Sequence, residues 1–129
     1  MRAVGRMAAG LLLAGLAAGC QTGGRSTATD ADGARALSSR LTGLVARCWY
    51  GSDAAGAFAG TVYAPEVNLG QPRILIVDED DPTGRPVLVI EPRGRATADV
   101  YGPLAAGPGG QGIRADIARW TTGSEDCTA

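Results

Sequence analysis

Two segments of the chain repeat apolar residues at the spacing of an α-helix. In the first segment these residues form a single stripe on a helix of about residues 33–48: Leu37, Leu41, Leu44, Val45 and Cys48. Asp30 or Asp32 can cap the start of this helix, and Gly51 can terminate it. In the second segment Ile113, Ile117 and Trp120 follow the same spacing, which predicts a short final helix.

The region between the two helices reads as strands and turns. The segments predicted as strands are Phe58–Tyr63, Arg73–Asp78, Pro86–Glu91 and Ala96–Tyr101. Residues 79–85 are too few for a helical crossover and contain Asp-Pro-Thr-Gly, so they predict an antiparallel hairpin. We expect connections over residues 64–72 and 102–112, both rich in turn-forming residues, and residues 52–60 show no clear pattern.

This order of elements predicts an α+β fold. It consists of an N-terminal helix, an antiparallel meander of three to four strands and a short C-terminal helix. Residues 21–33 contain no large apolar side chain, so we expect a flexible tether ahead of the first helix.

The first twenty residues have the organisation of a secretory signal. Arg2 and Arg6 precede an uncharged apolar run over residues 7–16, which is too short to span a bilayer. Small residues then lead into a cysteine, in the order Ala17-Ala18-Gly19-Cys20. This ending resembles the lipobox of bacterial lipoproteins, although Ala17 stands where that family prefers leucine. An ordinary signal peptide cut near Ala18 is one alternative, and a retained membrane anchor, which the short apolar run disfavours, is the other.

The lipobox resemblance implies a cellular address and an anchor. It implies that residues 1–19 are removed, that Cys20 is acylated and that the membrane is a partner through this lipid. Gln21, in the place where aspartate favours retention at the inner membrane, points by resemblance to the outer membrane, facing the periplasm. Residues 1–19 are then the signal peptide, residues 20–33 the lipidated tether and residues 34–129 a single domain.

Composition excludes several classes of function. From Cys20 onward the chain carries ten arginines and thirteen acidic residues, a net charge of −3, so we expect no nucleic-acid partner. The chain has no histidine and no lysine, which removes most metal and haem ligand sets and the usual bases of nucleophilic catalysis. We therefore expect no cofactor, no metal and no catalytic residue.

Two cysteines remain once Cys20 is assigned to lipid. In an oxidising compartment Cys48 and Cys127 are expected to form a disulfide, which closes a loop of about 80 residues and contributes roughly 4 to 5 kcal/mol in the chain-entropy model. The alternative, a redox-active pair, usually has the closer CxxC spacing.

Several short segments together resemble small proteobacterial envelope lipoproteins of unknown function. They are Cys48-Trp49, Ala64-Pro65-Glu66 with Asn68, Arg73-Ile74-Leu75, Tyr101-Gly102-Pro103-Leu104, Arg119-Trp120 and Cys127. This resemblance spans most of the predicted domain and implies no catalytic residues.

Two charged clusters are candidate binding sites. The carboxylates of Asp78–Asp81 could bind calcium, but the EF-hand spacing is absent, and we expect a solvated turn that limits aggregation beside the apolar strands. Arg93 and Arg95 flank a glycine and could hold an anionic group, or they simply decorate a turn.

Serines and tryptophans are the remaining candidates. Ser38, Ser39 and Ser52 could act as nucleophiles only with a base that the chain lacks. Trp49 and Trp120 flank the predicted disulfide, so they could bind a partner or, as we expect, pack in the core.

The two central strands are apolar at consecutive positions, which makes one face of the sheet a possible contact surface. Either Ile74 and Ile76 or Leu75 and Val77 must point away from the other pair. The predicted disulfide favours both helices on one face, which leaves aliphatic side chains on the other. The alternative is that residues 52–60 or 102–112 fold over that face.

These observations favour a membrane-anchored, non-enzymatic accessory or interaction module of the cell envelope. A periplasmic binder or inhibitor of a small molecule or of a hydrolase is the alternative, and an enzyme is a third hypothesis.

Overall fold

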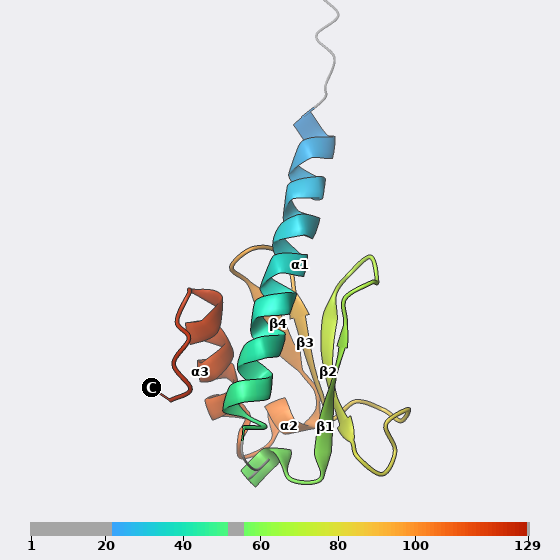
Figure 1. Cartoon of the computed structure of the whole chain (residues 1–129), viewed down its shortest axis with the longest axis vertical. Helices are drawn as coiled ribbons and strands as arrows, with labels where there is room; N and C mark the ends of the chain where they lie inside the picture. The colour runs from blue at the N-terminus through green and yellow to red at the C-terminus, as the bar shows by residue number, and fades with distance from the viewer. Residues whose placement is uncertain (1–21, 52–55, 129) are drawn as a thin grey trace, which may run out of the picture.

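The computed structural model describes residues 22–51 and 56–128 (Figure 1). In chain order the elements are α1 (Thr22–Cys48), the 3-10 turn η1 (Gly56–Phe58), β1 (Thr61–Glu66), β2 (Arg73–Asp78), β3 (Leu88–Pro92), β4 (Ala98–Tyr101), α2 (Pro103–Ala106) and α3 (Gly110–Thr121). The four strands form one sheet in the order β1-β2-β3-β4, and every neighbouring pair is antiparallel. The predicted α+β fold and its meander are therefore confirmed.

Both long helices cover the same face of the sheet. Figure 1 shows α1 crossing the sheet with α3 beside it. Ile74 and Ile76 of β2 and Leu88 and Ile90 of β3 are fully buried in one cluster with the apolar stripes of α1 and α3. Leu75 and Val77 therefore form the pair that points away from the helices, because successive side chains of a strand alternate between faces.

The first helix is longer than its sequence predicts. It begins at Thr22 rather than near residue 33, so residues 22–33, which we expected to be a flexible tether, are helical. Propagation from a packed helix adds one hydrogen bond per residue and avoids the cost of nucleation, which offsets the poor propensity of this segment. The side chain of Asp32 also pairs with Arg35 at 3.0 Å.

Gly33 is a packing residue rather than part of a linker. It is buried, and a Cβ atom built on it would lie 3.0 Å from the backbone nitrogen of Arg95. The turn between β3 and β4 therefore lies directly on α1 at this point. A larger side chain would push the two backbones apart.

Two expected connections contain regular structure. Residues 64–66 belong to β1, and Pro65 is accepted there because β1 is an edge strand. Residues 103–106 form α2, with Pro103 in its first turn, and α3 begins at Gly110, earlier than Ile113. The prediction that residues 102–112 are only loop is therefore wrong.

The predicted disulfide is confirmed and joins the end of α1 to the segment after α3. The Cα atoms of Cys48 and Cys127 lie 5.0 Å apart, and 79 positions separate the two residues. Trp49 and Trp120 beside the bridge are both buried, with ring centroids 5.2 Å apart. Their expected place in the core is also confirmed.

Among the described helices, none combines the length and the apolar character that crossing a membrane would require.

Candidate functional site

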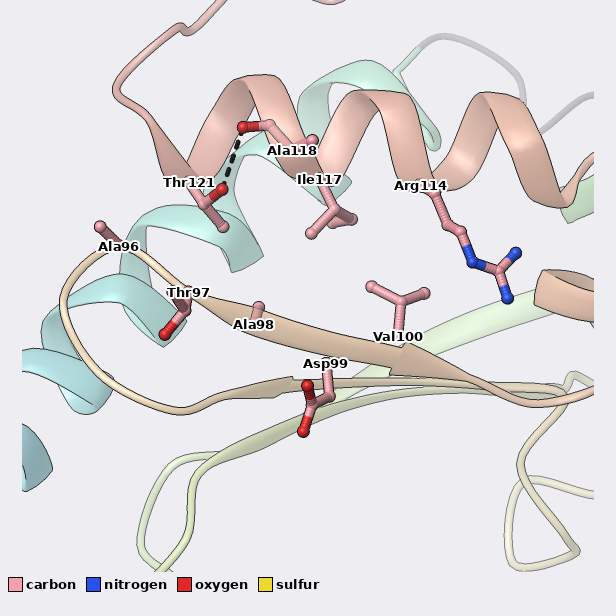
Figure 2. Close-up of a pocket in the computed structure, with 9 residues that line it drawn as sticks. All are labelled: Ala96, Thr97, Ala98, Asp99, Val100, Arg114, Ile117, Ala118 and Thr121. Carbon is pink, nitrogen blue, oxygen red and sulfur yellow. Dashed lines mark hydrogen bonds between the residues drawn. The ribbon is translucent and has the colours of Figure 1, made fainter.

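A groove of about 390 Å³ lies between β4 and α3 (Figure 2). The residues that line it are Ala96, Thr97, Ala98, Asp99, Val100, Arg114, Ile117, Ala118 and Thr121. Figure 2 shows Ala98 and Val100 pointing from β4 toward α3, and Ile117 and Thr121 pointing back from α3. The groove remains open because Ala98 and Ala118 are too small to fill the space between the strand and the helix.

Arg114 gives one end of the groove a positive charge. Its Nη1 donates to the carbonyl oxygen of Ala105 and, at 3.4 Å, to that of Gly110. A Cβ atom on Gly110 would lie 2.0 Å from the carbonyl oxygen of Ala105, so only glycine allows α2 and α3 to meet this closely. Arg114 as a whole is exposed, and Figure 2 places its guanidinium at the Val100 end of the groove.

The backbone of β4 has an open edge beside this groove. The N–H of Arg93 donates to the carbonyl of Thr97 at 2.9 Å, which sets the alternation of the β3–β4 ladder. Thr97, Asp99 and Tyr101 therefore bond toward β3, while the N–H and C=O groups of Ala98 and Val100 point outward. No hydrogen bond from the described residues reaches these outward groups.

The opposite face of the sheet carries a row of paired charges. Arg93 bridges two carboxylates, with Nη1 2.8 Å from Oε1 of Glu91 and Nε 2.6 Å from Oδ2 of Asp99. In the same row of the sheet, Arg73 pairs with Glu66 at 2.6 Å. Because these charges satisfy one another, the row does not present a free cation or anion to a ligand.

Hydrogen bonds to carboxylates of this row shift the pKa values of Arg93 and of the neighbouring Tyr101. The bond to Asp99 raises the pKa of the Arg93 guanidinium above its ordinary value. The hydroxyl of Tyr101 donates to Oε2 of Glu91 at 2.8 Å, and this bond raises the pKa of the phenol. Both shifts favour the state in which Arg93 is charged and Tyr101 is neutral.

The outward pair on β2 is less exposed than an uncovered sheet face would suggest. Val77 is only 2 % exposed and Val89, also on this face, 8 %. Val89 lies between Leu75 and Tyr101 on the neighbouring strands, and Val77 lies opposite Val62. The exposed apolar side chains of this face are Val62 and Tyr101, on the two edge strands. The described part of residues 52–60 and residues 102–112 do not cover it: Phe58 and Ala105 belong to the helix-side core.

The candidate residues from the sequence do not come together in one site. Cys20 and Ser52 lie outside the described residues. Ser38 is fully buried in α1 and Ser39 is exposed, so they lie on different faces of one helix. Arg93 is held in the row of paired charges, while Arg95 is exposed on the turn against Gly33.

The acidic cluster at the end of β2 is an exposed turn. The backbone N–H of Asp80 donates to Oδ1 of Asp78 at 2.9 Å, and the hydroxyl of Thr83 contacts Oδ1 of Asp81 at 3.5 Å. Residues 78–81 are all exposed. Within the described part of the chain, no group of three metal-ligating side chains is found.

Sequence reasoning missed the groove and the open edge. In the sequence this strand is marked only by apolar residues at every second position, Ala96, Ala98 and Val100. That pattern does not reveal which helix lies opposite the strand. Comparisons of the chain with protein-family models, with curated proteins and with solved structures found no match.

Proposed function

We propose that this chain is a lipid-anchored protein of the cell envelope whose domain works as a non-enzymatic interaction module. The observation that carries this proposal is the open β4 edge beside the groove, because it offers outward backbone groups next to a groove with a mixed polar and apolar lining. The anchor rests on the sequence Ala17-Ala18-Gly19-Cys20, and Gln21 favours the periplasmic face of the outer membrane.

The long first helix suits a protein held at a membrane by its N-terminal lipid. Thr22, the first residue of α1, follows two positions after Cys20. The eight residues from Thr22 to Thr29 precede Asp30, which already lines a pocket with the rest of the domain, and they span roughly 12 Å as a helix. They would hold the domain off the bilayer as a stiff spacer.

Two exposed apolar side chains lie at the end of the domain nearest the proposed anchor. Gly70 and Gln71, in the connection between β1 and β2, line a small pocket together with Ala34 of α1. This connection also carries Val67 and Leu69, which are 41 % and 46 % exposed. Val67 and Leu69 would therefore lie on the side of the domain that faces the bilayer, separated from it by the helical spacer.

Cell fractionation with intact-mass measurement tests the anchor. We expect the wild-type protein in outer-membrane fractions, with a mass that lacks residues 1–19 and includes acyl chains. Cys20→Ala should release the domain into the soluble fraction. A soluble wild-type protein with unmodified Cys20 would contradict the proposed anchor.

In-cell photo-cross-linking tests the module. A cross-linking residue at position 98, in the groove, should give a discrete product in the anchored protein, whereas one at Glu79, in the exposed turn, should not. Equal, diffuse products from both positions would contradict a dedicated contact site.

A further inference from the structure

The open edge of β4 and the groove beside it both suit a peptide with an extended backbone. The N–H and C=O groups of Ala98 and Val100 all point outward, and they lie two residues apart, which is the repeat of a paired strand. An antiparallel strand added here would bond to these two residues and continue the meander.

Side chains of such a strand would meet the groove in alternation. Residues of the added strand opposite Ala98 and Val100 would project on the helix side, into the space lined by Ile117, Ala118 and Thr121. A volume of about 390 Å³ accommodates small or medium apolar side chains. The residue between them would lie on the other face, above Asp99.

Charge complements this arrangement at one end of the groove. Arg114 is the cation of the lining; the residue is exposed, and its guanidinium lies at the Val100 end. Asp99, the acidic residue of the lining, points to the opposite face and is paired with Arg93. Among the described residues Arg114 bonds to the carbonyl oxygens of Ala105 and Gly110 but to no carboxylate, so the charge of the lining that lacks an ion-pair partner there is positive, which favours a carboxylate on the bound strand.

We propose that β4 and α3 bind an extended peptide segment of a partner protein, which adds as an antiparallel fifth strand at β4. Alternate apolar side chains of this segment occupy the groove, and an acidic side chain reaches Arg114. This inference deepens the interaction module proposed above and rests on it for its biological setting. The peptide binding itself needs no membrane, so the two can be tested apart.

Backbone NMR on the full chain, isotopically labelled and purified in detergent, tests the proposal. The probe is a capped six-residue peptide in the order glutamate, threonine, valine, lysine, valine, threonine, with three relatives that carry alanine, leucine or threonine at both valine positions. With bound peptide, the amides of Ala98 and Val100 should shift and exchange about tenfold more slowly. The amides of Asp99 and Tyr101, already in the ladder with β3, should keep their exchange rates.

N-methylation of the peptide gives a matched control. In an antiparallel pair, the N–H groups of the two valines face β4, while those of the lysine and of the first threonine face away. Methylation of both valine nitrogens should abolish binding, and methylation of the other two should leave it. Equal binding by the two methylated peptides would overturn strand addition.

Two protein variants locate the site independently. Ala98→Pro removes one outward N–H and should weaken binding about tenfold. Arg114→Gln should weaken binding of the glutamate peptide but not of the same peptide with glutamine in its place. Unchanged affinity in both variants would overturn the assignment to β4 and α3.

The remaining outcomes also decide the proposal. If all four peptides at about 1 mM leave Ala98 and Val100 unchanged, strand addition is overturned, whatever the fractionation of Cys20→Ala shows. If these amides become protected with rising protein concentration alone, the edge is closed by a second copy of the chain, and the peptide proposal falls. If peptide binds but the wild-type protein is not lipidated, the anchor fails and this inference stands.

Discussion

The two edge strands of the sheet, β1 and β4, present different backbone groups to an incoming strand. Along β1, the N–H of Glu79 bonds to the carbonyl of Gly60, so the outward backbone positions are Thr61, Tyr63 and Pro65. Proline has no N–H to offer to another strand. Along β4 the outward positions are Ala98 and Val100, and both keep their donors.

The two edges also differ in how side chains fill the space beside each edge strand. At β1 aromatic rings fill this space: the ring centroid of Tyr50 lies 5.1 Å from that of Tyr63 and 5.8 Å from that of Phe58. The hydroxyl oxygen of Tyr50 also lies 2.7 Å from the hydroxyl oxygen of Thr61. At β4 small side chains leave a groove. The β1 edge therefore lacks one outward N–H, at Pro65, and its side-chain space is filled, whereas the β4 edge keeps both its outward N–H groups and an open groove beside them.

The largest expected effect comes from removing the disulfide that ties α3, the wall of the groove, to α1. Replacing Cys48 and Cys127 by serine should lower the free energy of unfolding by roughly 4 to 5 kcal/mol, because the unfolded chain regains a loop of 79 positions. Thermal and denaturant unfolding measure this loss, with Cys20→Ser as the control that keeps the bridge. Native-state hydrogen exchange should rise more in α3 and β4 than in β1. An equal rise would show that the disulfide does not act mainly on the β4 side of the sheet.

A pair of proline substitutions tests the alternation along β4. Asp99→Pro removes an N–H that bonds to β3 and should cost about 2–3 kcal/mol, whereas Ala98→Pro removes an outward N–H and should cost less than about 1 kcal/mol. Denaturant unfolding compares the two, and Asp99→Ala separates the loss of the ion pair with Arg93. Similar costs for both proline variants would show that the alternation is wrong.

Restoring a donor to β1 should make the two edges more alike. Pro65→Val adds an outward N–H and should lower stability by about 0.5–1 kcal/mol, mainly by freeing the unfolded chain. We also expect concentration-dependent association in sedimentation experiments. Ala64→Val, whose N–H faces β2, is the matched control and should remain unassociated.

The smallest expected effect concerns one tyrosine near each edge. Burial raises the pKa of Tyr50 beside β1, and the hydrogen bond to Glu91 raises that of Tyr101 in β4. Because both folded pKa values lie above the ordinary value of about 10, this contribution to stability is complete below that pH and is lost as the pH rises through the folded values. Tyrosinate absorbance should show that Glu91→Gln lowers the pKa of Tyr101 and leaves that of Tyr50 unchanged. A change in the pKa of Tyr50 in this variant would contradict the inference that burial raises the pKa of Tyr50 while the hydrogen bond to Glu91 raises that of Tyr101.

Local pattern was sufficient for the elements with a strong repeat. The stripe from Leu37 to Val45 and the apolar run from Ile74 to Val77 were assigned correctly, because each buries one continuous surface. It failed where packing overrides composition: residues 22–33 are helical although glycine-rich, and β1 continues through Pro65. In these places the neighbouring packed segment, rather than intrinsic propensity, decides the conformation.

The sequence by itself determined the α+β class, the meander and the disulfide partners, because periodicity, turn residues and the count of cysteines are local or countable properties. Only the tertiary structure decided that Leu75 and Val77 point away from the helices, and that Ala98 and Val100 face α3 across an open groove. Register and helix placement set these relations between segments distant in the chain, and a one-residue change in register would have exchanged the two faces.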